Sequence, residues 1–416
     1  MEVIGVRILA DPESAALALA FVGGGIALGT VSGLTPGLHV NTVAVIMASL
    51  APTIPAPPHL LGASMLSAGV THSFLDVVPT LAIGVPDAAM AVSALPGHRL
   101  VMGGRGREAL RISAVGSASA IATAAVLGIP VTYVMRSVVT TLDSWIPAAI
   151  GAIALFLVVT EHGYRATVGG ALSLGASGLL GIAFLDVTTG GLVPGGDTLL
   201  PLLSGLFGIP ILVHAYGGAG VPPQGGPTVA ASSEETLGWG MVGALSGSLV
   251  AYLPGVSAAV AAAMAFSVLP TTSGDRAFVA TVSGVNTSNT IFALFALVAL
   301  GTPRTGVLVA IERAELPVNL PLVLASIVIA AAVSFVLVPV LGDRYLSLVG
   351  SVDPRRLSVA VALLLAVLVG LFTGVPGIGI LGIASAVGLF PVHFGARRVH
   401  LMGVLLVPIA LRGIVG

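Results

Sequence analysis

A histidine and an aspartate stand four residues apart inside an apolar stretch of this sequence. The two residues are His72 and Asp76, and on a helix residues at this spacing share one face. Within a lipid bilayer an ionisable side chain is costly, and it usually marks the path of an ion or a substrate. We therefore predict that His72 and Asp76 form an ion-coupling pair that carries a proton. The alternative is a buried hydrogen bond that only fixes helix packing.

A Pro-Gly dipeptide at 36–37 breaks the first long apolar segment. Proline removes a backbone N–H donor, and glycine lets the chain turn and approach a ligand closely. A helix that restarts after the break presents N–H groups and a positive dipole end, which favour a carboxylate or a phosphate. The alternative is a kinked helix whose hydroxyl side chains satisfy its own carbonyls. The predicted substrate-binding residues around this break are Ser32, Thr35, Pro36, Gly37, His39, Asn41 and Thr42.

A second Pro-Gly dipeptide, at 254–255, follows the first at an offset of 254 − 36 = 218 residues. Downstream, the Gly-Val-Pro at 84–86 matches the Gly-Thr-Pro at 301–303, with 303 − 86 = 217. Hydrophobic segments interrupted by Gly and Pro at corresponding places of two halves point to the binding site of a secondary transporter. The predicted substrate-binding residues of the second break are Pro254, Gly255 and Ser257.

Five consecutive hydrogen-bonding side chains lie between these two marks in the second half. They are Asn286, Thr287, Ser288, Asn289 and Thr290. A lipid-facing helix would leave these groups without partners at a high cost in free energy. We predict that the run faces a cavity or forms an unwound turn, and interhelical hydrogen bonding is the alternative. Together with Ser73, which follows His72, the run completes a predicted site in which both breaks meet at one central cavity.

The composition is that of a membrane protein. Mean hydropathy is +1.09, 56% of residues are hydrophobic and only 8% are charged, whereas soluble domains carry about 25% charged residues. We predict an all-α polytopic protein of the cell membrane, with about 10–14 transmembrane or re-entrant helices. These helices form two repeated halves in inverted orientation, with the Pro-Gly breaks at the membrane midplane.

Several kinds of chemistry are excluded by what the sequence lacks. There is no cysteine, no His/carboxylate spacing typical of a metal site, no phosphate-binding glycine loop and no nucleophile elbow. The formal net charge is −1, which does not favour a polyanionic partner. We expect no enzyme activity, no catalytic residue, no cofactor, no metal centre and no nucleic-acid partner.

The chain divides at its one long polar stretch rich in Gly, Pro and Ser. We predict a first transmembrane repeat at 1–215, a flexible linker at 216–236 and a second repeat at 237–416. Four arginines in the loop at 97–111 predict that this loop is cytoplasmic. The predicted spans are roughly 15–35, 39–54, 60–84, 109–135, 145–160, 166–185, 197–215, 237–252, 254–269, 278–300, 317–341, 357–375, 377–393 and 399–415.

At these residues the chain resembles the large membrane subunit of tripartite tricarboxylate transporters, particularly their shorter archaeal branch. The matching features are Gly-x-x-Pro-Gly at 33–37, the polar stretch leading to 84–86, the segment 201–210, the break at 253–257 and the run at 286–290. The resemblance implies uptake of a di- or tricarboxylate driven by an H⁺ or Na⁺ gradient. It also implies two partners, a small membrane subunit and an extracytoplasmic binding protein. The chain departs from the bacterial members in being shorter and in carrying His39 and Asn41.

A second resemblance competes with the first. The segment Leu-Pro-Gly-Val-Ser at 253–257 is similar to the corresponding break of polyprenyl-phosphate translocases. A soluble tricarboxylate should need at least two cationic groups, and this sequence places few arginines at membrane depth, so a single phosphate on a lipid tail is a second candidate substrate. A third alternative is a non-transporting membrane assembly protein, which would not need duplicated breaks.

Overall fold

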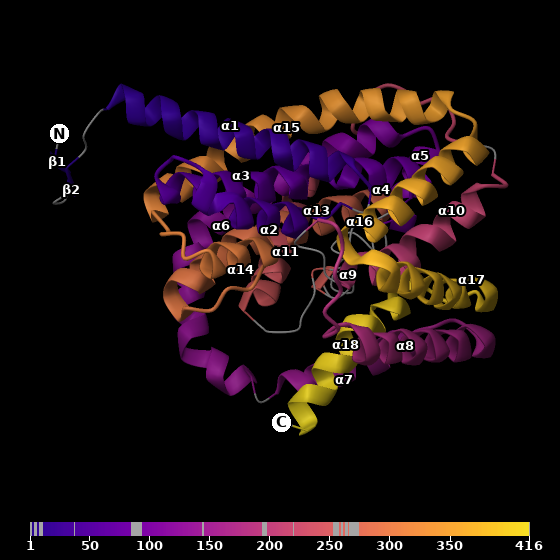
Figure 1. Ribbon diagram of the computed structural model, residues 1–416. Coiled ribbons are helices and arrows are strands. Elements are labelled where there is room, and N and C mark those ends of the chain that lie inside the picture. The colour runs from indigo at the N-terminus through magenta and orange to yellow at the C-terminus, as the bar shows by residue number, and fades with distance from the viewer. Residues whose placement is uncertain are drawn as a thin grey trace.

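The computed structural model describes residues 2–3, 6–7, 11–36, 38–84, 94–143, 145–193, 198–218, 220–252, 258, 261–262, 265 and 274–415. Apart from a short pair of strands, β1 (Glu2–Val3) and β2 (Val6–Arg7), all the regular elements in these ranges are helices (Figure 1). Seven of the described helices are long and apolar enough to cross a membrane. The prediction of an all-α, multi-pass membrane protein is confirmed.

The helices follow the predicted spans closely. The first half contains α1 (Pro12–Leu34), α2 (Val40–Leu50), the 3₁₀ turn η1 (Ala51–Thr53), α3 (Pro58–Leu75), α4 (Val77–Ile83), α5 (Ala94–Met102), α6 (Gly106–Asp143), α7 (Ile146–Val159), α8 (Tyr164–Phe184), α9 (Leu199–Leu203), the π-helical turn η2 (Ser204–Gly208) and α10 (Ile209–Ala215). The second half contains α11 (Ser233–Tyr252), α13 (Gly274–Leu300), α14 (Gly306–Arg313), α15 (Leu320–Ser351), α16 (Pro354–Gly388), α17 (Phe390–Phe394), the 3₁₀ turn η4 (Arg398–Met402) and α18 (Gly403–Val415).

Helix α16 contains the break that separates the predicted spans 357–375 and 377–393. Gly374 adopts φ 68° and ψ −164°, a conformation that interrupts the helix and that residues with a Cβ rarely adopt. Pro376 follows two residues later. The sequence therefore marked a real interruption at this position.

A stripe of glycines on α1 packs directly against the backbone of α3. A Cβ atom at Gly25 would overlap the carbonyl oxygen of Ser64, and one at Gly29 would lie 2.8 Å from the Thr71 Cβ atom. Gly33 is equally close to the start of the next turn, where its Cβ would lie 2.8 Å from that of Leu75. Small residues at four-residue spacing let two membrane helices approach closely. The contacts advance in the same order along both chains, so α1 and α3 run parallel.

The second half contains a corresponding pair. Gly243 and Gly247 of α11 lie 218 residues after Gly25 and Gly29, and they pack against α13 in the same manner. A Cβ at Gly243 would overlap the carbonyl oxygen of Thr281, and one at Gly247 would overlap the Ser288 hydroxyl. Helices α11 and α13 therefore also form a close parallel pair.

The two pairs run in opposite directions. Near α5 lie the end of α4, through the His98–Leu81 hydrogen bond, and the start of α13, through the Arg99–Asp275 ion pair. Helix α4 continues α3, so α3 approaches α5 whereas α13 leaves it.

The third long helix of each half crosses to the other half. Helix α6 packs along α13 and α11, and α15 packs along α3. Polar contacts accompany the packing: the Ser113 and Ser283 hydroxyls are 2.8 Å apart, and the Ser334 hydroxyl donates to that of Thr71 at 3.0 Å. The two halves are interlocked rather than placed side by side.

The segment between the halves is bound to the rest of the protein. Gln224 accepts a hydrogen bond from the Gly106 N–H at 2.7 Å and donates one to the Val101 carbonyl at 3.1 Å. The Gly225 N–H donates to the Gly104 carbonyl at 2.8 Å. Composition alone predicts a flexible linker, but these contacts tie the segment to the loop between α5 and α6. Helix α11 begins at Ser233, which places the end of the linker before residue 236.

Buried Glu108 joins this segment to both halves. Its carboxylate accepts hydrogen bonds from Arg276 at 2.6 Å and from the Ala230 N–H at 2.9 Å. Breaking a buried ion pair costs about 3–5 kcal/mol, and because Arg276 is 25% exposed we expect Glu108→Ala to cost about 3 kcal/mol. Thermal unfolding in detergent measures this. The control is Arg99→Gln in the neighbouring exposed pair, which should cost about 1 kcal/mol or less. Equal effects of the two changes would contradict the assignment.

Candidate functional site

The first break separates α1 from α2, as predicted. Helix α1 ends at Leu34 and α2 begins at Val40, with His39 as its N-cap. The His39 Nδ1 atom accepts a hydrogen bond from the Asn41 N–H at 3.1 Å, which fixes the imidazole at the helix N-terminus. The Thr35 hydroxyl donates back to the Val31 carbonyl at 2.7 Å, so this side chain satisfies its own helix.

Two histidines meet beside this break. The Ser32 Oγ atom lies 3.0 Å from the His72 Nδ1 atom, and both residues are buried. The ring centroids of His72 and His39 are 5.4 Å apart. The contact brings side chains of α1, α3 and the start of α2 to one point, because the glycine stripe of α1 lets His72 approach Ser32 closely.

Asp76 is linked to the other half of the chain. It caps the end of α3, where it is 3% exposed, and its Oδ2 atom accepts a hydrogen bond from the Asn286 side-chain amide at 2.7 Å. The same amide donates to the Ser73 carbonyl at 3.3 Å. The Ser73 hydroxyl itself donates back to the Val70 carbonyl at 2.8 Å. A helix of each half therefore supplies one partner of a buried polar contact.

The polar run 286–290 is not an unwound turn, because α13 is regular over its whole length. Instead, successive residues on a helix point in different directions, and each finds a different neighbour. Asn286 faces α3, the Thr287 hydroxyl donates to Ser117 of α6 at 2.9 Å, and the Ser288 hydroxyl donates to the Ala244 carbonyl of α11 at 3.4 Å. Interhelical hydrogen bonding, the alternative considered for this run, describes these first three residues.

The last two residues of the run are half-buried. The Asn289 Oδ1 atom is buried and accepts no hydrogen bond from the described residues. Thr290 lies near Gly69 of α3, where a Cβ atom would be 3.9 Å from the Thr290 methyl group. A buried amide oxygen without a donor is unfavourable unless a ligand or water supplies one.

The chain beyond α13 returns to the first break. Asn41 packs so closely on Gly306, at the start of α14, that a Cβ atom there would overlap the Asn41 amide. Two residues earlier, the buried Nε atom of Arg304 has no acceptor among the described residues. Arg304 was not among the predicted site residues, because next to a Gly-x-Pro it has the appearance of a solvated loop charge. Its place 218 − 1 residues after Asp87 was the available signal.

The structure brings some of the predicted residues together and not others. A buried polar cluster, called here the central cluster, consists of Ser32, His39, His72, Ser73, Asp76 and Asn286. Thr35, Thr287 and Ser288 are engaged elsewhere. Pro36 and Thr42 are buried beside the break. Gly37, Pro254, Gly255 and Ser257 lie outside the described residues.

Comparison with known proteins decides the family. A family model described as "Tripartite tricarboxylate transporter TctA family" matches residues 19–403. The chain belongs to the TctA family. It is a membrane transporter component of the tripartite type, in agreement with the resemblance seen in the sequence.

A TctA-family chain of this size has a relative among the archaea. An uncharacterized protein of Methanocaldococcus jannaschii is 26% identical over 400 residues, covering 93% of this chain and 96% of its own length. No solved structure matches the chain.

Proposed function

We propose that this TctA-family chain is an ion-gradient-driven permease for a di- or tricarboxylate, bound at the central cluster. The observation that carries the proposal is the contact between Asp76 and Asn286. It is buried, it joins the two halves, and it lies beside the N-terminus of α2. An anion at that N-terminus would meet free N–H groups and a positive dipole end.

The inverted arrangement of the halves supports transport by alternating access. The parallel pair α1–α3 and the parallel pair α11–α13 run in opposite directions, and their glycine contacts repeat at an offset of 218 residues. Two inverted repeats around a binding site let one half move against the other, so that the site opens to either side of the membrane. We propose 1–215 and 237–416 as these repeats.

Charge at the cluster supports coupling to a cation. A carboxylate substrate near the buried Asp76 carboxylate would be repelled strongly, because the surroundings screen charge poorly. A proton taken up by the His72 and Asp76 pair, or a Na⁺ ion held by nearby oxygens, removes this repulsion. Substrate and cation would then bind together. Arg304 is a candidate counter-charge for the substrate, since its Nε atom is buried without an acceptor in the described chain.

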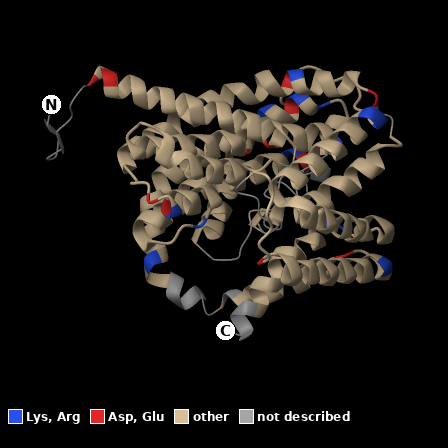
Figure 2. Cartoon of the chain, viewed as in Figure 1, with Lys and Arg blue, Asp and Glu red and all other residues tan. Residues whose placement is uncertain are grey.

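The distribution of arginine supports one orientation. Arg99, Arg105, Arg107 and Arg111 gather near α5, and Arg111 pairs with Asp343 near the end of α15 at 2.9 Å (Figure 2). By the positive-inside rule this end is cytoplasmic. The first break then opens toward the outside, where an extracytoplasmic binding protein would deliver substrate, with a small membrane subunit as the second partner.

Substrate binding tests the proposal without the need for partners. Citrate and succinate at 100 times their Kd should stabilise the purified protein by about 2.7 kcal/mol, seen as a rise in Tm. Asn286→Ala should abolish that rise, because it removes the donor to Asp76. Thr281→Val, on the same helix but away from the central cluster, should retain it.

Two outcomes would count against the carboxylate. One is an undiminished response of Asn286→Ala to substrate. The other is stabilisation by polyprenyl phosphate alone, which would favour the lipid-carrier alternative over the carboxylate.

A further inference from the structure

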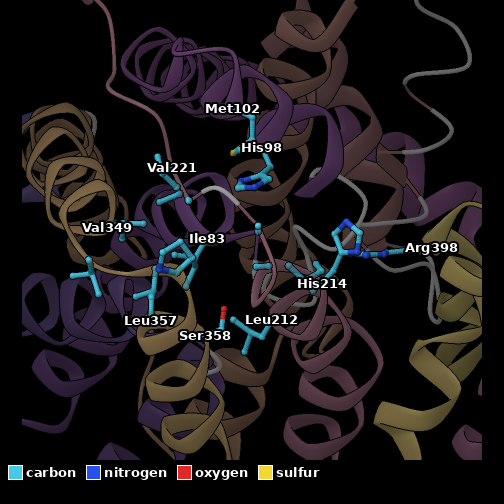
Figure 3. Close-up of a pocket in the computed structure, with 18 residues that line it drawn as sticks. Ile83, His98, Met102, Leu212, His214, Val221, Val349, Leu357, Ser358 and Arg398 are labelled. Atoms are coloured by element: carbon cyan, nitrogen blue, oxygen red, sulfur yellow. The ribbon is translucent and has the colours of Figure 1, made fainter.

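A second chemically distinct cavity lies near α5, at the opposite end of α4 from Asp76. Its volume is about 380 Å³, within the range of small-molecule sites. It is formed by the ends of α4, α10 and α15, the start of α16, part of α5 and the segment between the halves (Figure 3). It shares no residue with the central cluster.

The lining of this cavity is apolar except on a few side chains. Apolar residues such as Ile83, Leu212 and Leu357 make up most of the wall. The polar side chains are His98, His214, Ser358 and Arg398, and no acidic residue lines the cavity. Figure 3 shows the histidines and Arg398 directed at the same cavity as Leu212 and Leu357. The cavity therefore combines an apolar wall with positive or potentially positive groups.

Arg398 has no partner within the described part of the chain. The preceding residue, Arg397, pairs with Glu161 at 2.8 Å and also donates to the Leu157 carbonyl. No hydrogen bond or ion pair of this kind reaches the half-buried Arg398 from any described residue. A guanidinium that is partly removed from water needs an anion or several acceptors to offset its lost hydration.

One histidine is held ready to act as a second polar contact. Its Nδ1 atom lies 2.8 Å from the Leu81 carbonyl, and because a carbonyl only accepts, the His98 Nδ1–H is the donor. The Nε2 atom is thereby left for the cavity, as an acceptor when the ring is neutral and as a donor when it is protonated. A protonated headgroup oxygen or an anion can therefore bind here.

We propose that this cavity binds an amphipathic anion, namely a carboxylate or phosphate group carried on an apolar chain. Arg398 binds the head, with His98 and His214 beside it, and the chain lies along the wall formed by Ile83, Leu212 and Leu357. A citrate-like ion is a poor match, because its three carboxylates would face mostly apolar surface. The proposal is independent of the transport function, since neither Asp76 nor Asn286 takes part.

Binding of paired amphiphiles to the full-length protein in an uncharged detergent tests this assignment. Dodecanoate and dodecyl phosphate should bind at least about tenfold more tightly than dodecanol, because a charge-assisted hydrogen bond contributes about 1.5–3 kcal/mol. Arg398→Gln should reduce their affinity to that of dodecanol. Arg356→Gln, an exposed arginine at the same end of the protein, is the matched control and should change nothing.

A second variant addresses the apolar part of the site. Ala215→Phe places a large side chain in the cavity and should reduce the binding of dodecanol and dodecanoate alike. Citrate-induced stabilisation should persist in both variants, which shows that they fold and separates this cavity from the central cluster. Equal binding of dodecanol and dodecanoate to the wild type, or an unchanged preference in Arg398→Gln, would overturn the proposal.

The source of the headgroup is resolved by mass spectrometry of the intact purified protein. An anionic phospholipid retained by the wild type and lost from Arg398→Gln identifies a membrane lipid as the ligand. Binding of added dodecanoate without any retained phospholipid identifies a free amphiphilic acid.

Discussion

Asp76→Asn should leave the protein folded and able to bind substrate, while uptake into proteoliposomes no longer responds to an imposed pH gradient. Asn has nearly the shape of Asp and can still contact the Asn286 amide, but it cannot take up and release a proton. A buried carboxylate whose charge changes during the cycle can couple the two fluxes, whereas a neutral amide cannot. The measurement is uptake of labelled substrate with and without the gradient.

Asp343→Asn provides the control for this experiment. Asp343 pairs with Arg111 and is partly exposed, far from the central cluster in the fold, so its loss should leave the response to the gradient intact. If Asp76→Asn transports normally with an unchanged pH dependence, the His72 and Asp76 pair is structural. The coupling ion would then be Na⁺, held by hydroxyl and carbonyl oxygens near the first break.

The second large effect should come from a single methyl group on α1. Gly25→Ala places a Cβ atom into the carbonyl oxygen of Ser64, so the pair α1–α3 must separate. We expect a loss of about 3 kcal/mol or more, at the upper end of the range for overpacking, since the contact is with backbone that has no rotamer to change. Unfolding of the purified protein by heat, followed by loss of helical signal, measures the loss.

The adjacent glycine gives the opposite sign. A Cβ atom at Gly24 would meet nothing within 4 Å, so Gly24→Ala should stabilise the protein by about 0.5–1 kcal/mol through helix propensity alone. In the second half, Gly243→Ala and Gly238→Ala form the same contrast. A similar stability of Gly25→Ala and Gly24→Ala would show that α1 and α3 do not pack through this stripe.

The sequence was most informative where a rule of membrane chemistry applies to single residues. Hydropathy located the spans, and the break at 36–37 and the interruption near Gly374 follow from Pro and Gly. His72 and Asp76 stood out because charge is rare at membrane depth. Each of these signals is local, so one chain suffices to detect it.

The rest depends on which helix faces which, and the sequence does not contain that information locally. The run 286–290 was expected at a cavity or an unwound turn, yet three of its residues contact three different helices of a regular bundle. Arg398 appears near the end of a predicted span and gives no sign that it lines a cavity with His98, 300 positions earlier. A partner for an isolated arginine becomes visible only when all its neighbours are known.

The crossing of α6 and α15 has a consequence for biosynthesis. When the first half leaves the ribosome and enters the membrane, Thr71 and Asp76 of that half have not yet met Ser334 and Asn286, and Ser117 has not met Thr287. Their polar groups face lipid, water or each other until the later helices arrive. The first half therefore cannot complete its tertiary structure during synthesis, and helix insertion must precede assembly of the bundle. A stop codon placed after α10 would leave a membrane-inserted but unfinished protein, a natural substrate for the quality-control proteases of the cell.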